Sequence, residues 1–173
     1  MPISPTKQVC FISSEVARPN DDHVKDILQY NEYRNTSRWN RRPYHYYVGL
    51  HAPANGWHAF RRHPTVGDPL SCVREPRNIH DRNAVKVYWG RKAVGMIPKG
   101  VAKFVAEHMD RGYIKHVTAF HTGHMNHANT IDFGQGPKLL CNYFFEFEDV
   151  SKRNKLLNEL LNEFDTTRLL EFP

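Results

Sequence analysis

The chain has 173 residues, of which 40% are hydrophobic and 24% are charged, and its formal net charge is +6. This composition indicates a folded chain with one ordinary domain and excludes collagen-like and wholly disordered proteins. No apolar run reaches the ~20 residues that a membrane-spanning helix requires, so the sequence predicts no membrane partner. The three cysteines lie far apart, which argues against a disulfide scaffold and predicts a nuclear or cytoplasmic location.

The basic charge is concentrated in the middle of the chain. Residues 34–143 carry 17 basic and 6 acidic side chains, whereas the net charges of residues 1–33 and 144–173 are −2 and −3. A confined positive charge suits a polyanion such as nucleic acid, because each neutralised phosphate releases counterions. A solvated basic surface is the alternative interpretation.

Residues 1–42 are expected to form a partly ordered arm or linker. They are rich in Pro, Asn, Asp, Ser and Arg, with a short apolar patch at Val9–Ile12 and a weak helical stretch at Asp21–Tyr33. In the basic end of this arm we expect a tryptophan to stack on bases and two arginines to follow the phosphate backbone. These three residues are Trp39, Arg41 and Arg42.

A pattern of short β runs extends over residues 43–149, which we predict to be one domain. Its aromatic, β-branched or alternating runs are Tyr44–Leu50, Leu70–Arg74, Ala84–Trp89, Ala93–Ile97, Ile114–His121 and Leu139–Glu148. Helical spacing of apolar residues over Lys99–Asp110, behind Pro98, predicts one embedded helix. The sequence therefore predicts a mainly β fold with α: a small, curved structure of about six strands.

Residues 150–173 follow a helical pattern. Leucines recur at helical spacing behind Ser151, a candidate N-cap, which predicts an amphipathic helix over Val150–Leu170. In one interpretation this helix packs on its own domain. In the other, it binds a protein partner or drives self-association.

Two motifs in the β region resemble the HIRAN family. The first is EPRNIHDRNAV at Glu75–Val85, and the second is VGMIPK at Val94–Lys99. HIRAN domains occur at the N-termini of Swi/Snf-type fork-remodelling DNA translocases and as standalone modules. The resemblance covers roughly Tyr44–Glu148. It implies an OB-like β-barrel that binds single-stranded DNA and holds its 3′-hydroxyl end.

The resemblance also implies the residues of the binding site. They are His45, Tyr46, His80, Asp81, Lys99 and Phe133. His45 and His80 depart from the family pattern, which has arginine and tyrosine at these places. Histidine is a weaker phosphate partner than arginine at neutral pH. The sequence therefore predicts nucleic-acid binding in general, and capture of a 3′ end as the more specific expectation.

The chemistry of these side chains suits the same ligand. Tyr46, His80 and Phe133 offer flat faces for base stacking. Asp81 can accept a hydrogen bond from a sugar hydroxyl, and Lys99 can bind a phosphate beside a helix start. Each has a structural alternative: an Asx-turn for Asp81, a core position for Tyr46 or its neighbour, and a solvated helix start for Lys99.

Eleven histidines are many for this length. His121, His124 and His127 recur at a spacing of three and are weak candidates for zinc ligands. No paired cysteines accompany them, so a polar loop bordering the binding groove is the preferred interpretation, and the sequence predicts no metal.

No Walker loop, Gly-x-Ser-x-Gly or His-Glu-x-x-His motif occurs, so we predict no catalysis and no cofactor. The hypothesis is a binding module for single-stranded DNA, with a role in DNA repair and with RNA as an alternative ligand. A protein-interaction adaptor that uses the C-terminal helix is one alternative. A metal-dependent nuclease or other hydrolase is the other, with candidate ligands Asp68, His80, Asp81 and Asp132.

Overall fold

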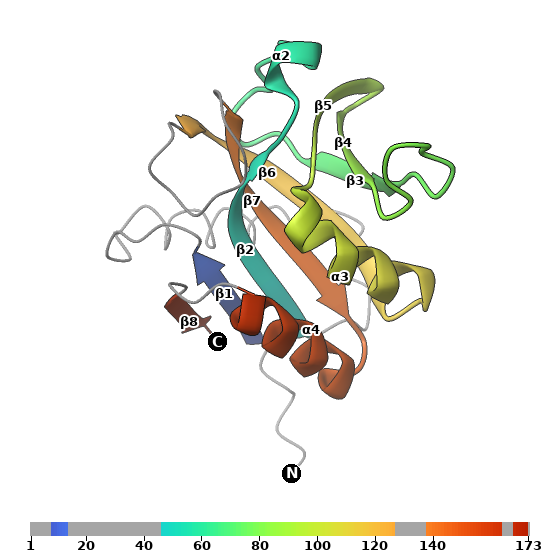
Figure 1. Ribbon diagram of the computed structural model, residues 1–173. Coiled ribbons are helices and arrows are strands. Elements are labelled where there is room, and N and C mark those ends of the chain that lie inside the picture. Colours follow the sequence, from blue (N-terminus) through green and yellow to red (C-terminus); the bar gives the residue numbers. More distant parts are fainter. Residues whose placement is uncertain (1–7, 14–45, 127–137, 164–167, 173) are drawn as a thin grey trace.

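The computed structural model describes residues 8–13, 46–126, 138–163 and 168–172 (Figure 1). Strands dominate these residues, and two of the helices span three turns or more. The elements are β1 (Gln8–Ser13), β2 (Tyr46–Ala54), α2 (Trp57–Phe60), β3 (Leu70–Arg74), β4 (Val85–Trp89), β5 (Lys92–Met96), α3 (Lys99–Asp110), β6 (Ile114–Asn126), β7 (Lys138–Phe147), α4 (Val150–Glu163) and β8 (Arg168–Phe172).

The strands form one sheet in the order β5-β4-β3-β6-β7-β2-β1-β8. The sheet curves until Asn55, which follows β2, exchanges two backbone hydrogen bonds of 2.8 Å with Met96 at the end of β5. This bridge closes β2 to β7 into a six-stranded barrel. The predicted mainly β fold of about six strands, with an embedded helix and a C-terminal helix, is confirmed.

Gly95 permits the close approach of β2 and β5 at this bridge. A Cβ atom added to Gly95 would lie 2.7 Å from the Cβ of Ala54 and 3.1 Å from the carbonyl oxygen of Asn55. No side chain fits at such a separation without moving one strand. The missing side chain of Gly95 is therefore a condition for barrel closure.

Two strands lie in segments for which the sequence predicted something else. β1 belongs to the predicted arm, yet it pairs in parallel with β2 from Gln8–Tyr46 to Ser13–His51. β8 belongs to the end of the predicted helix, but α4 ends at Glu163 and β8 pairs antiparallel with β1. Both are short apolar segments whose strand partners are remote in sequence, so their local pattern did not predict a strand.

The two longer helices cover one side of the sheet (Figure 1). Leu156, Leu157 and Leu160 of α4 are buried in the same core as Val101 and Val105 of α3. The leucine face of α4 thus packs on its own domain, as in the first of the two interpretations. None of the helices in the described ranges has both the length and the apolar character to cross a lipid bilayer.

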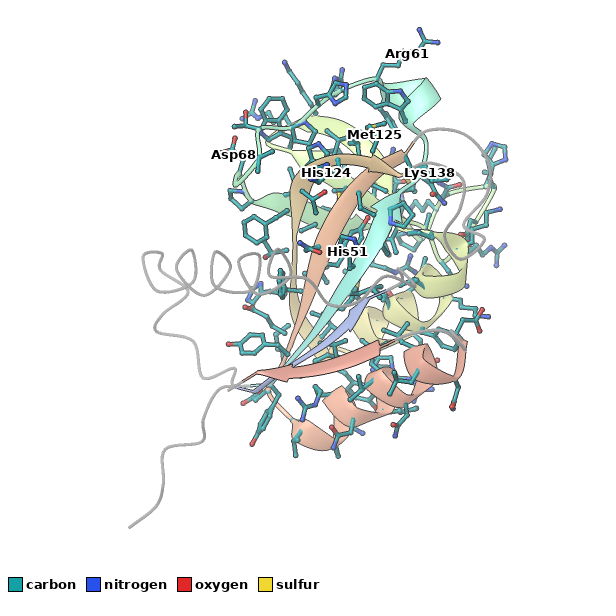
Figure 2. All side chains as sticks on the ribbon, turned by 90° about the vertical axis from the view of Figure 1, so that its left-hand side faces the viewer. His51, Arg61, Asp68, His124, Met125 and Lys138 are labelled. Atoms are coloured by element: carbon teal, nitrogen blue, oxygen red, sulfur yellow. The ribbon has the colours of Figure 1, made fainter. Side chains whose placement is uncertain are left out.

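Alternation along β2 separates its two faces. Val48 and Leu50 enter the core, whereas Tyr47 and His51 lie on the opposite face and are also buried. Figure 2 labels His51. There, His51 Nδ1 lies 2.6 Å from Oδ1 of Asn142 on β7. The alternation places Tyr46 on the core side of the strand.

Candidate nucleic-acid site

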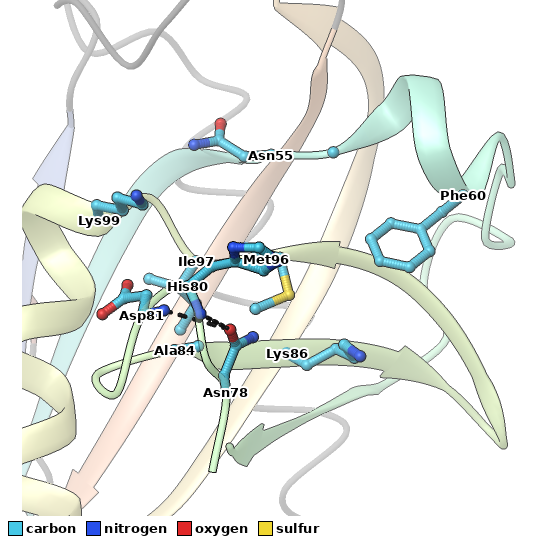
Figure 3. A pocket seen from close by; sticks show the side chains of 11 residues that line it. Asn55, Phe60, Asn78, His80, Asp81, Ala84, Lys86, Met96, Ile97 and Lys99 are labelled. Carbon is cyan, nitrogen blue, oxygen red and sulfur yellow. Dashed lines mark hydrogen bonds between the residues drawn. The ribbon is translucent and has the colours of Figure 1, made fainter. Parts of the chain in front are cut away.

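A pocket of about 360 Å³ lies where the barrel closes (Figure 3). Its walls come from the segment after β2, the loop before β4, the end of β5 and the start of α3. Three of the predicted site residues line it: His80, Asp81 and Lys99. The structure thus brings together residues from both sequence motifs, in a space of the size that small ligands occupy.

The loop that carries His80 and Asp81 is held by hydrogen bonds of its own. Asn78 Oδ1 accepts from the backbone N–H groups of His80 (2.9 Å) and Asp81 (3.2 Å) (Figure 3). Asn78 Nδ2 donates to the carboxylate of Glu75. Asp81 Oδ1 accepts from the N–H of Asn83 at 2.9 Å, which is the Asx-turn considered as its alternative role. Its second oxygen has no hydrogen-bond partner among the described residues and remains available to a ligand.

Arg74 fixes the same loop to the far end of α3. Its guanidinium donates to the carbonyl oxygens of Ala84 (2.8 Å) and Arg82 (3.0 Å), and to both carboxylate oxygens of Asp110 at 2.9 Å. The hydrogen bond from Arg74 lowers the pKa of Asp110, so the pair stays charged. Arg74 thus ties the loop that carries Asp81 to the helix that begins at Lys99.

The chain segments that form the pocket carry a net positive charge, and Lys86 and Lys99 line the pocket itself. Residues 55–100 contain nine Lys or Arg and three Asp or Glu side chains. Lys86, on one wall, pairs with Glu75 at 2.8 Å, and their hydrogen bond lowers the pKa of Glu75 and raises that of Lys86. Lys99 is exposed, forms no ion pair within the described ranges, and lies in the first turn of α3, which holds no acid. This corner suits an anionic group.

Phe60 supplies an aromatic surface that the sequence analysis missed. Its ring lies over Gly56, since a Cβ there would meet the ring at 3.1 Å, and it lines the pocket together with Met96 (Figure 3). Phe60 belongs to α2, a four-residue helix between residues with positive φ, Gly56 at 93° and Arg61 at 47°. One turn is too short to produce a periodic signal, so the sequence pattern did not indicate this helix.

The structure does not bring Tyr46 to the pocket. Tyr46 begins β2, whereas the pocket lies after the end of that strand, roughly 25 Å away at ~3.3 Å per residue. Its ring packs against the core, 5.8 Å from the guanidinium of Arg153 on α4. The other predicted contacts lie outside the described residues: Trp39, Arg41, Arg42, His45 and Phe133.

The histidine tract lies on β6, away from the pocket. His121 is buried with Nδ1 3.2 Å from the carbonyl oxygen of Leu140, His124 is exposed, and His127 lies outside the described residues. Within the part of the chain that the structure describes, no group of His, Cys, Asp or Glu could hold a metal ion. Burial lowers the pKa of His121, and the nearby His63 and His124 lower it further, although the Leu140 carbonyl opposes this.

Protonation of His121 is expected to make stability pH-dependent. In the unfolded chain its imidazole takes a proton near the ordinary pKa of 6.5, whereas in the folded chain it does so only at lower pH. Between these values the unfolded state binds more protons, so the contribution of His121 is complete above pH ~6.5 and declines as pH falls through the folded pKa.

Urea unfolding of the wild type and of His121→Gln between about pH 5 and 8 measures this effect. The variant should show a shallower loss of stability on acidification than the wild type. Parallel curves for His121→Gln and the wild type would contradict the prediction.

The HIRAN domain family model matches residues 44–133, just over half of the chain. The protein belongs to the HIRAN family. The crystal structure of the HIRAN domain of human HLTF is similar at 17% identity, with a TM-score of 0.51 over 66% of this chain and 88% of that one. The NMR structure of the same domain shares 19% identity, with a TM-score of 0.47 over 66% and 87%. No curated protein sequence matches the chain.

These findings confirm the HIRAN resemblance and the OB-like fold. Membership of the HIRAN family supports a nucleic-acid-binding module, of a kind that is generally non-catalytic. Lys99, an exposed lysine on the wall of the pocket, agrees with such a partner.

Proposed function

We propose that this HIRAN domain binds single-stranded DNA and that the pocket receives the 3′-hydroxyl end of the strand. The observation that carries the proposal is the meeting of Asp81, Lys99 and Phe60 around one pocket. A carboxylate, a cation and an aromatic ring match the three parts of a terminal nucleotide: hydroxyl, phosphate and base.

Each side chain has a distinct role in this proposal. Lys99 and the N-terminal amides of α3 bind the last internucleotide phosphate. The free oxygen of Asp81 accepts the hydrogen bond of the 3′-hydroxyl. Phe60 and His80 contact the base. Stacking on aromatic side chains accepts any of the four bases, because each base has a flat face.

Asp81 is the reason to propose an end rather than an internal stretch of the strand. A carboxylate among cations weakens binding of an internal phosphate, because like charges repel. It favours a hydroxyl donor in the same place. A 3′-terminal phosphate would therefore bind less tightly than a 3′-hydroxyl.

Fluorescence anisotropy with 5′-labelled oligonucleotides tests the proposal. We expect the wild type to bind a 3′-hydroxyl strand more tightly than its 3′-phosphate counterpart, and Asp81→Asn to reduce this difference. Lys99→Ala should weaken binding about tenfold, because one phosphate contact is lost. For the same reason, the slope of log K against log salt concentration should fall by about one. Lys155→Ala, an exposed lysine on α4, is the matched control and should leave affinity unchanged.

Equal affinity for the two ends would reduce the proposal to general strand binding, and no measurable binding would refute it. An RNA strand of the same sequence, measured in parallel, decides between DNA and RNA as the preferred ligand. On this proposal the domain is a nuclear DNA-repair module that recognises strand ends, while any catalysis belongs to a partner protein.

A further inference from the structure

Among the large hydrophobic residues that the structure describes, Ile79 has the most exposed side chain. Its exposed fraction is 91%, compared with 55% for Val66 and 47% for Val73. Single exposed aliphatic residues are common on protein surfaces. The position of Ile79 is unusual, because it lies between Asn78 and His80, which both line the pocket.

The backbone on both sides of Ile79 is held in place. The Asn78 N–H donates to the carbonyl oxygen of Glu75 at 3.0 Å, and Asn78 Oδ1 accepts from the N–H of His80. Arg74 anchors the end of the same loop through the carbonyl oxygens of Arg82 and Ala84. The loop thus presents Ile79 to solvent from a fixed backbone, and a ligand that covers the side chain does not have to order the loop first.

The surroundings of Ile79 select the kind of surface that covers it. Arg77 and Arg82, on the same loop, are exposed, and the acidic Glu75 is paired with Lys86. An aliphatic side chain between two arginines that form no ion pair in the described residues suits a ligand that combines apolar faces with negative charges beside them. The faces of nucleobases along a phosphate backbone have this arrangement, and aliphatic side chains pack against them in other nucleic-acid complexes.

We propose that Ile79 packs against the base of the second nucleotide from the strand end and separates it from its neighbours. The inference rests on the proposed function, in which the pocket holds the terminal nucleotide. Ile79 then sets the direction in which the strand leaves the pocket. It contributes affinity through base contact, independently of the phosphate contact at Lys99.

The test uses 3′-hydroxyl oligonucleotides that carry 2-aminopurine at the second or at the sixth nucleotide from the 3′ end. The fluorescence of this base rises when it loses stacking on its neighbours. At saturating protein, we expect the wild type to increase the signal of the second-position probe and Ile79→Ala to give a smaller increase. The sixth-position probe should not differ between the two proteins.

Affinity for the unmodified strand provides the second readout. Ile79→Ala should weaken binding about three- to tenfold, because a contact between apolar surfaces is lost. Ile79→Leu should retain most of the affinity, and Val66→Ala, which also shortens an exposed β-branched side chain, is the matched control. The exposure of Ile79 predicts that these variants fold like the wild type.

The outcomes separate the two proposals. If the wild type prefers a 3′-hydroxyl strand but Ile79→Ala matches it in both affinity and fluorescence, the role of Ile79 is refuted and the proposed function stands. If the wild type does not bind these strands, the proposed function fails and the role of Ile79 fails with it.

Discussion

Replacing Gly95 with alanine is expected to lower the free energy of unfolding by about 1–3 kcal/mol, the usual cost of an added methyl group in a closely packed interior. The new Cβ would lie 2.7 Å from the Cβ of Ala54, so β5 has to move away from β2. That movement strains both hydrogen bonds between Asn55 and Met96, which close the barrel. Urea unfolding measures the loss.

Two further variants make this prediction specific. Gly100→Ala is the control, because its Cβ would meet only Glu163 at 3.5 Å, and alanine favours a helix over glycine. It should unfold at the same urea concentration as the wild type or at a higher one. Ala54→Gly combined with Gly95→Ala removes one partner of the clash and should recover part of the loss. Unfolding of Gly95→Ala at the wild-type midpoint would show that the barrel closes without this glycine.

Replacing Arg74 with alanine should have the second large effect, a loss of about 1–3 kcal/mol of stability. The change removes the donors for the carbonyl oxygens of Ala84 and Arg82 and leaves Asp110 without its partner. Since the loop before β4 carries His80 and Asp81, affinity for a strand end should also fall. Urea unfolding measures the loss of stability. Backbone amide exchange at Glu75, whose N–H donates to the carbonyl oxygen of Ala84, reports the loosening of the loop.

Variants of the two partners separate the loop contact from the surface ion pair. Asp110→Asn keeps the carbonyl contacts of Arg74 and removes an ion pair whose carboxylate is 56% exposed, so it should cost less than about 1 kcal/mol. Arg74→Lys keeps the charge but lacks the planar fork that reaches all four acceptor oxygens, so its stability should lie between those of Arg74→Ala and the wild type. If Asp110→Asn equals Arg74→Ala, the ion pair rather than the loop contact carries the stability.

The resemblance placed His80, Asp81 and Lys99 in the candidate site, and local sequence chemistry accounts for the loop and the helix start that carry them. His80 and Asp81 lie in a loop whose Asn and Asp side chains bond their own backbone, a pattern that is visible within a few residues. Lys99 follows a proline that begins a helix, which is also a local signal. The barrel strands were predicted because alternating aromatic and β-branched residues mark half-buried strands.

The remaining features depend on contacts between distant residues. The resemblance placed Tyr46 in the site together with His80, Asp81 and Lys99, but the length and register of β2 put it at the opposite end of the strand from the pocket. Phe60 reaches the pocket because α2 packs beside β5, a contact that no local pattern expresses. β1 and β8 became strands through pairing with each other and with β2, so neither short segment could be assigned alone.

The position of β1 in the sheet has a consequence for the order of folding. All six strands of the barrel lie between Tyr46 and Phe147, and three of their pairings, β3-β4, β4-β5 and β6-β7, join neighbours in the sequence. β1 instead pairs with β2 on one side and with the much later β8 on the other, and the second pairing joins the first and the last strand of the described residues. Because contacts between remote segments form slowly, the barrel is expected to assemble first during synthesis and the β2-β1-β8 edge last.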